Sequence, residues 1–224
     1  MASMFPVDLR LKGRRVLLVG AGRVGSRKME KILSAGASLI VVEKFLDEKA
    51  ESLWRSGRIM WRPNFSAELL EGVSLVLAAS SDPALNRMVG EAARSRGLWL
   101  NVADDPASSD FFMPALIERG DFRLTVSTGG ESPALTARVA ARLRAEFGPE
   151  YGRLTRLLGR LRPLVLAAGL TAAEREHVFR RLAGSAALLA ALAAEDEEEI
   201  QKQTKALLAP TETGNEPEPG LWRD

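Results

Sequence analysis

The sequence predicts an α/β fold in which a doubly wound parallel sheet is followed by a small α+β region and a helical carboxyl-terminal region. Apolar runs of strand length alternate with helix-like segments through roughly residue 105, and short links join them. Such alternation favours a parallel sheet with right-handed crossovers. The pattern then changes to two β-like runs around a turn, and beyond residue 148 the chain is helix-like.

The first strand and the turn after it predict a dinucleotide site. The apolar run 16–19 is followed by the sequence Gly-Ala-Gly-Arg-Val-Gly at positions 20–25, and a helix-like segment occupies 27–33. G-x-G-x-x-G in this context gives a tight turn, close approach to a pyrophosphate and helix–strand packing. N–H groups at the helix start then face the anion. The residues expected to bind the cofactor here are Gly20, Gly22, Arg23, Val24 and Gly25.

An acidic residue after the second strand strengthens this interpretation. Residues 38–42 form an apolar run, and Glu43 follows it about 20 residues after the glycines, where an acid holds the adenosine ribose of NAD. A glycine-rich turn without a ligand is the alternative. Strand, spacing and acid together favour binding, so we expect a Rossmann domain with NAD as its cofactor.

The remaining elements complete four predicted domains. Asp82-Pro83 starts a helix as an N-cap followed by proline, and Thr171 with Glu174 forms a capping-box pattern. The expected domains are an NAD-binding domain at 1–110, a hairpin plus helix at 111–148, a helical domain at 149–208 and a disordered tail at 209–224. The expected helices are 46–56, 66–70, 82–95, 132–147 and 171–194, and the further strands are 59–61, 73–79, 97–102, 111–117 and 122–126, with a turn at 118–121.

Composition excludes several kinds of chemistry. The chain has no cysteine and one histidine, His177, so disulfides, zinc thiolate sites, a cysteine nucleophile and a multi-histidine metal site are excluded. We expect no metal-ligating residues and a cytoplasmic location. No run approaches the ~18 apolar residues of a membrane helix, and the first residues lack a signal-peptide pattern.

Charge is unevenly distributed along the chain. The net charge is +2, but residues 195–224 hold nine acidic and three basic residues, so the first 194 residues carry +8. A basic body suits a small polyacid. Its arginines and lysines are scattered rather than grouped in a stripe with aromatic residues, so nucleic acid is not expected.

Two further strand ends offer polar groups where open α/β sheets bind ligands. Ser80 and Asp82 follow the fourth strand, and a cofactor contact and a plain capped turn explain them equally well. Asn101 and Asp104 follow the fifth strand. A carboxylate beside a nicotinamide can act as a base, while Asp105-Pro106 also suits an ordinary turn. The residues alone favour neither.

A small, glycine-rich turn precedes the helix that begins at residue 132. Thr128, Gly129, Gly130 and Ser132 would present N–H donors to a carboxylate or phosphate of a substrate. The alternative is a turn that requires positive φ at the two glycines.

Several of these segments together resemble one family. The chain is similar, over about residues 5–165, to the precorrin-2 dehydrogenase/sirohydrochlorin ferrochelatase family, which includes the N-terminal part of siroheme synthase. The segments that carry the resemblance are 5–7, 19–25 with Arg27 and Lys28, 79–83 with Asn86, 101–106, 112–115 and 127–133.

The resemblance implies an enzyme. It implies NAD-linked oxidation of precorrin-2 to sirohydrochlorin, Fe²⁺ insertion at the same site in many members, and a homodimer whose subunits exchange parts of the central region. Asp104 would be the base and a transient metal contact, and Asn101 would join the turn at Thr128 in binding the tetrapyrrole. Glu43 stands where many members have a non-acidic residue, and Thr128 stands where one branch has a modified serine.

Two other functions remain open at this point. A non-enzymatic NAD-sensing dimer would explain residues 20–43 equally well, but not Asp104 or the turn at Thr128. A dehydrogenase of another small acid would use a histidine or lysine near a strand end for proton transfer, and the sequence shows neither in the pattern that such enzymes use. Whether chelation occurs, and with iron or cobalt, is also open.

Overall fold

The computed structural model describes residues 4–103 and 105–209. The chain divides into two compact units, of which the first comprises Met1–Met113 with Gly129–Glu131 and the second Pro114–Thr128 with Ser132–Asp224. Asp104 and the tail from residue 210, for which disorder was predicted, lie outside the described residues. None of the helices in the described ranges combines the length and apolar character needed to cross a membrane.

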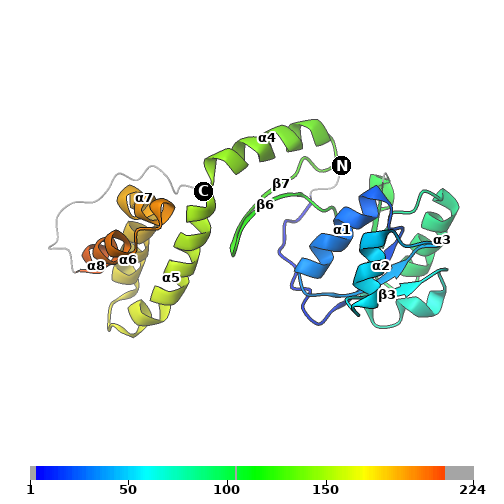
Figure 1. The fold of residues 1–224 in the computed structure, drawn as a ribbon, viewed down its shortest axis with the longest axis horizontal. Coiled ribbons are helices and arrows are strands. Elements are labelled where there is room, and N and C mark those ends of the chain that lie inside the picture. The colour runs from blue at the N-terminus through cyan, green and yellow to red at the C-terminus, as the bar shows by residue number, and fades with distance from the viewer. Residues whose placement is uncertain (1–3, 104, 210–224) are drawn as a thin grey trace. The chain divides into compact units, whose positions relative to one another are not determined.

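The first unit is a five-stranded parallel sheet with the strand order β3-β2-β1-β4-β5 (Figure 1). The predicted Rossmann-like fold is therefore confirmed. The elements are β1 (Arg15–Val19), α1 (Arg23–Ser34), β2 (Ser38–Val42), α2 (Glu48–Arg55), β3 (Ile59–Arg62), η1 (Ala67–Leu70), β4 (Val73–Ala78), α3 (Pro83–Arg94), β5 (Trp99–Val102) and η2 (Pro106–Ser108).

Strand pairing brings the predicted binding segments to one edge of the sheet. β1 is central, and its last residue, Val19, aligns with Val42 of β2 and Ala78 of β4. Main-chain hydrogen bonds continue past the strand ends, because Gly20 N donates to Val42 O at 2.9 Å and Ala79 N donates to Val19 O at 2.7 Å. The carboxyl ends of β1, β2, β4 and β5 therefore share an edge, where such sheets bind ligands.

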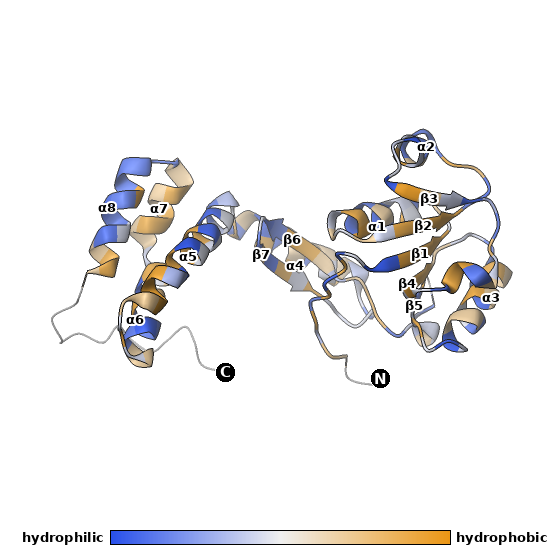
Figure 2. Cartoon of the chain, turned by 90° about the horizontal axis from the view of Figure 1, so that it is seen from below, coloured by the Kyte–Doolittle hydropathy of each residue, from blue (hydrophilic) through white to orange (hydrophobic). Residues whose placement is uncertain are grey.

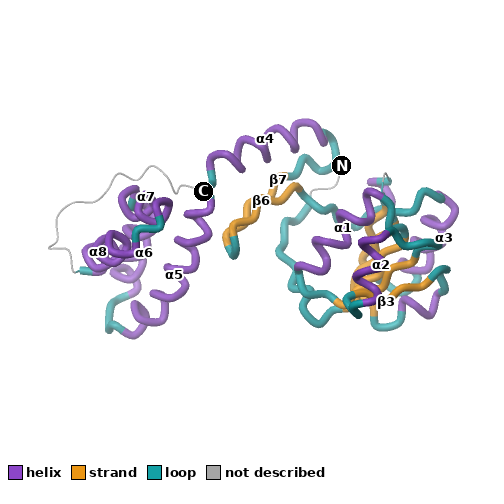
Figure 3. Tube along the Cα trace, in the orientation of Figure 1, coloured by secondary structure: helices purple, strands orange, loops and turns teal. Residues whose placement is uncertain are grey.

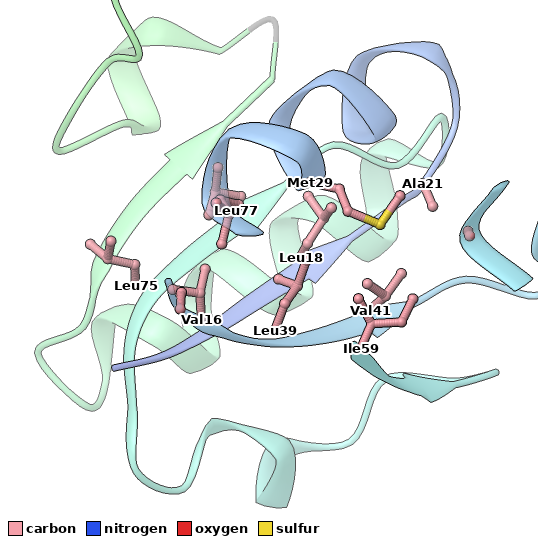
Figure 4. Close-up of a cluster of buried hydrophobic side chains, with 12 residues drawn as sticks. Val16, Leu18, Ala21, Met29, Leu39, Val41, Ile59, Leu75 and Leu77 are labelled. Atoms are coloured by element: carbon pink, nitrogen blue, oxygen red, sulfur yellow. The ribbon is translucent and has the colours of Figure 1, made fainter. Parts of the chain in front are cut away.

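Two apolar clusters hold helices against the two faces of the sheet. One cluster joins alternate strand residues such as Leu18 and Val41 to Met29 of α1 and Ala50 of α2 (Figure 4). The other joins the opposite face of the strands to Val89 and its neighbours on α3. The strands are accordingly apolar on both faces, and Figure 2 shows them as largely hydrophobic.

Capping side chains determine at which residue α2 and α3 begin, which the apolar pattern alone predicted less accurately. The helix expected at 46–56 begins at Glu48, because the Asp47 side chain accepts a hydrogen bond from Ala50 N at 2.8 Å. α3 starts at Pro83 as predicted, with Asp82 as its N-cap.

The second unit begins with an antiparallel hairpin (Figure 3). The strand expected at 111–117 is displaced: β6 spans Ala115–Arg119 and β7 spans Phe122–Val126. The turn is therefore two residues long, with Gly120 at φ 63°. Phe111 and Met113 instead pack against an apolar cluster of the first unit, and the proline at 114 cannot donate a ladder hydrogen bond.

Up to residue 209, five helices follow the hairpin: α4 (Pro133–Glu146), α5 (Pro149–Ala167), α6 (Ala172–Gly184), α7 (Ala186–Ala194) and α8 (Glu197–Leu208). Leu157, Leu182 and Leu192 belong to the core shared by α5 to α8. The single helix expected at 171–194 is wrong, because Ser185 interrupts it. Its hydroxyl accepts from Leu188 N at 3.1 Å and caps α7, as serine commonly does at a helix start.

The acidic cluster at 195–199 forms the start of α8. Asp196 caps the helix by accepting from Glu199 N at 3.0 Å, and three glutamates occupy the first turn. Negative charge is favourable there because it opposes the helix dipole. The cluster therefore forms and stabilises the start of a helix.

Candidate cofactor and substrate site

The turn after β1 has the geometry that its glycines predict. Gly20 has φ 91°, a conformation that L side chains rarely adopt, and a Cβ there would overlap the carbonyl of Ala79. A Cβ on Gly25 would overlap the carbonyl of Gly20, because α1 packs directly on the turn. Gly22 differs, because a Cβ on this residue would meet no atom within 4 Å. Two glycines therefore permit the packing, while the third leaves room above the turn.

The room above Gly22 fits the pyrophosphate of NAD. Gly22 is the N-cap of α1 and provides no side chain to cap the helix, whose first turn contains no acidic residue. Arg23 opens the helix and adds a positive charge. The N–H groups of a helix start, and its dipole, attract an anion. The residues present can therefore hold the phosphates of the cofactor.

Glu43 is fixed beside this turn. Its Oε2 accepts a hydrogen bond from Ala21 N at 2.7 Å, and its Oε1 accepts one from Lys44 N at 2.9 Å. Its main-chain carbonyl accepts from Trp61 Nε1 at 2.8 Å. Each carboxylate oxygen can accept a second hydrogen bond, so two ribose hydroxyls could still bind. The predicted ribose contact is thus geometrically possible, and it stays a prediction.

Ser80 and Asp82 shape the loop after β4. Asp82 caps α3 by accepting from Ala84 N at 2.8 Å, and the Ser80 hydroxyl accepts from Asp82 N at 3.1 Å. Asn86 is 9% exposed, accepts from Ser80 N at 3.1 Å and donates to Ser80 O at 2.9 Å. The capped-turn alternative therefore describes these side chains, and the cofactor contact of Ser80 and Asp82 stays a prediction.

The end of β5 brings together residues that are distant in the sequence. Asn101 is 5% exposed, and its amide nitrogen donates to Phe111 O at 2.9 Å. Its Oδ1 accepts a hydrogen bond from the ammonium of Lys28, which reaches it from α1. The predicted substrate residue Asn101 therefore lies at the ligand edge of the sheet. Sequence reasoning did not select Lys28, whose partner is 73 positions away.

Two aspartates, Asp104 and Asp105, follow β5 in the sequence. Asp104, the predicted base, lies outside the described residues. Asp105 caps η2, and its Oδ1 accepts from Ser108 N at 3.1 Å. Hydrogen bonding from Ser108 lowers the pKa of Asp105 below its ordinary value. Asp105 thus has the turn role that Asp105-Pro106 suggested.

The turn at Thr128 belongs to the chain segment that leads into α4. Gly129 and Gly130 have φ values of 64° and 92°, so positive φ at both glycines is confirmed. The Thr128 hydroxyl accepts from Ser132 N at 3.1 Å and lies 3.1 Å from the hydroxyl of Thr136. Ser132 caps α4 by accepting from Leu135 N at 3.3 Å. Substrate binding by these residues stays a prediction.

Comparisons with known proteins agree with this geometry. Residues 7–115 match a family model described as putative NAD(P)-binding. A solved structure described as SirC, precorrin-2 dehydrogenase, superposes with a TM-score of 0.74 and 26% identity, covering 90% of this chain and 100% of that one. The chain resembles the precorrin-2 dehydrogenase family. The resemblance inferred from the motifs is thereby confirmed.

Longer relatives carry the name siroheme synthase. Siroheme synthase 1 of Aeromonas salmonicida is 36% identical over 210 residues, which cover 93% of this chain and 45% of the relative. The siroheme synthase of Chromobacterium violaceum is 38% identical over 166 residues, which cover 74% of this chain and 35% of the relative. The chain thus spans less than half the length of these relatives.

Proposed function

We propose that this chain is an NAD-dependent dehydrogenase that oxidises precorrin-2 to sirohydrochlorin. The likeness to SirC carries the proposal, because it extends over the whole of that chain. The turn at Gly22 and the fixed carboxylate of Glu43 support NAD as the cofactor.

The reaction removes a hydride and a proton from the substrate. NAD⁺, when bound, supplies the hydride acceptor. In this proposal Asp104, which follows the last residue of β5 by two positions in the sequence, accepts the proton, since a carboxylate can act as a base. No cysteine and no second histidine in the sequence competes for this role.

The substrate suits the charge of the chain. Precorrin-2 carries several acetate and propionate groups, and the first 194 residues carry +8. In this proposal Asn101, Thr128, Gly129, Gly130 and Ser132 bind the tetrapyrrole. Fe²⁺ or Co²⁺ would enter as a second substrate whose ligands are the pyrrole nitrogens, with Asp104 removing the N–H protons. Within the described ranges, no group of three or more His, Cys, Asp or Glu residues is placed to hold a metal ion.

A homodimer and a cytoplasmic location complete the proposal. Within the described residues, β6 and β7 pair only with each other. A lone two-stranded sheet has little stability in water, so pairing with a second copy would stabilise it. A chain without cysteine suits the reducing cytoplasm.

The proposal is tested by mixing the protein with NAD⁺ and precorrin-2 and following the absorbance of NADH and sirohydrochlorin. The wild type should form both products. Asp104→Ala should lose most of the oxidation, and any chelation of Fe²⁺ or Co²⁺, while calorimetry still detects NAD⁺ binding. The neighbouring Asp105→Ala is the matched control and should remain active, since Asp105 caps η2. Full activity of Asp104→Ala would exclude Asp104 as the base, and a wild type that forms no NADH would favour an NAD sensor.

A further inference from the structure

Lys28 places an ammonium group at the ligand edge of the sheet. The residue lies one turn into α1, directly after the glycine turn, and its side chain is partly buried. Its Nζ donates to Asn101 Oδ1 at the end of β5. Of the four basic residues in α1, Arg23 lies at the exposed start of the helix, whereas the Lys28 ammonium reaches the end of β5.

Asn101 determines where this ammonium lies. The Phe111 carbonyl can only accept, so the Asn101 nitrogen must face it, as the 2.9 Å hydrogen bond shows. Asn101 Oδ1 must then face the opposite way, toward an ammonium that can only donate. Both ends of the amide are thus assigned by their partners, and the near-complete burial of Asn101 fixes its orientation.

The position of Lys28 suits recognition of a carboxylate. In open α/β sheets the ligand binds outside the carboxyl ends of the strands, and β5 ends at Val102, next to Asn101. A lysine ammonium has three donors, and hydrogen bonds from it to a carboxylate are charge-assisted. We propose that Lys28 binds a carboxylate of the tetrapyrrole substrate, with Asn101 holding the ammonium in place. This inference rests on the proposed function.

A purely structural role for Lys28 makes different predictions. A lysine that only tied α1 to β5 would affect the stability of the glycine turn, and hence NAD⁺ binding, as much as substrate binding. A lysine that binds the substrate should affect mainly the KM for the tetrapyrrole. Lys31 provides a matched control, because it lies on the same helix and is exposed.

The test measures three quantities in the full chain: the KM for precorrin-2, the Kd of NAD⁺ and the Tm. The variants are Lys28→Met, which removes the charge but keeps the length, Lys28→Arg, which keeps the charge, and Lys31→Met. Lys28→Met should raise the KM about tenfold or more, as expected for loss of a hydrogen bond to a charged group. It should leave the Kd of NAD⁺ within about twofold, a change too small to signal loss of such a bond. The KM of Lys28→Arg for precorrin-2 should lie close to that of the wild type, and the KM of Lys31→Met should equal it.

Salt provides a second readout. The KM of the wild type should rise with ionic strength, because salt screens the attraction between the ammonium and a carboxylate, and this rise should be smaller in Lys28→Met. An unchanged KM in Lys28→Met overturns the inference and leaves the proposed function intact. The inference is also overturned, in favour of a structural role, if Lys28→Met and Lys28→Arg lose NAD⁺ affinity and Tm to the same extent as each other. A wild type that forms no NADH from precorrin-2 refutes the proposed function, and the inference with it.

Discussion

Alanine at Gly22 and alanine at Gly25 should both weaken NAD⁺ binding, but only alanine at Gly25 should destabilise the fold. Gly22 has φ −62° and ψ −170°, which any residue can adopt, and a Cβ there would stand in open space. Replacing a glycine by alanine at such a position stabilises a protein by about 0.4–1 kcal/mol, since the unfolded chain loses freedom, but alanine is a poorer N-cap than glycine and this loss offsets the gain. The added methyl group would occupy the space assigned to the pyrophosphate. Gly22→Ala should therefore leave the Tm nearly unchanged while NAD⁺ affinity falls at least tenfold, or about 1.4 kcal/mol.

Gly25→Ala should act on the fold itself. A Cβ there would overlap the Gly20 carbonyl, which is main chain and cannot move without shifting the turn. Overpacking of this kind costs about 1–3 kcal/mol, and the better helix propensity of alanine returns about 1 kcal/mol. A net loss of up to about 2 kcal/mol corresponds to a fall in Tm of roughly 4–8 °C in a chain of this size.

Two measurements separate these effects: thermal unfolding followed by circular dichroism, and titration calorimetry with NAD⁺. Both variants should bind NAD⁺ poorly, but only Gly25→Ala should lose stability. If Gly22→Ala binds NAD⁺ as the wild type does, the pyrophosphate does not lie over Gly22. If Gly22→Ala unfolds as early as Gly25→Ala, the space above Gly22 is not open.

Two further predictions concern carboxylates. Glu43→Gln keeps an acceptor for Ala21 N but removes the negative charge that would repel the 2′-phosphate of NADP⁺. The preference for NAD⁺ over NADP⁺, measured by calorimetry as the ratio of the two Kd values, should therefore fall about tenfold. An unchanged ratio would contradict the ribose contact. Hydrogen bonding from Thr171 lowers the pKa of Glu174 from its ordinary value of 4.5, so its contribution to stability is complete above that value and is lost as the pH falls through the lowered pKa in the folded state. Amide exchange at the start of α6 should accordingly accelerate on acidification in the wild type, and much less in Glu174→Gln, whose side chain does not titrate in this range.

The fold of the first unit could be predicted because its signals are local. β1, β2 and β4 contain continuous apolar runs, and a glycine stands one or two residues before each of the five strands. The second unit was predicted less accurately where two local signals competed. A Leu/Ala-rich pattern continues through Ser185, yet this serine can also cap a helix, and its hydrogen bond to Leu188 N ends one helix and begins the next. At the hairpin, the tight turn at Gly120 extended β6 into the predicted turn, while Phe111 packed elsewhere.

The parts of the site that lie within one continuous stretch of sequence could be predicted. One helix and one strand, α1 and β2, separate the glycine turn from Glu43, and the spacing of this unit predicts that the two meet. Lys28 and Asn101 meet through the long side chain of a residue on α1, and no periodicity in the sequence encodes that contact. Asn86 entered the sequence analysis only as part of the resemblance, because its hydrogen bonds to Ser80 depend on how the loop after β4 folds back.

The hydrogen bonds also divide the polar candidates into two groups. Asp82, Asp105 and Ser132 each use their side chain to cap a helix, so a ligand that took those oxygens would leave a helix start without its cap. Glu43 and Asn101 instead bond groups that lie at the ligand edge without ending a helix, namely Ala21 N and the Lys28 ammonium. Substituting a residue of the first group should therefore lower stability before it alters affinity, whereas substituting one of the second should alter affinity first. The order in which Tm and Kd change along such a series would distinguish ligand contacts from scaffold, independently of any assumed substrate.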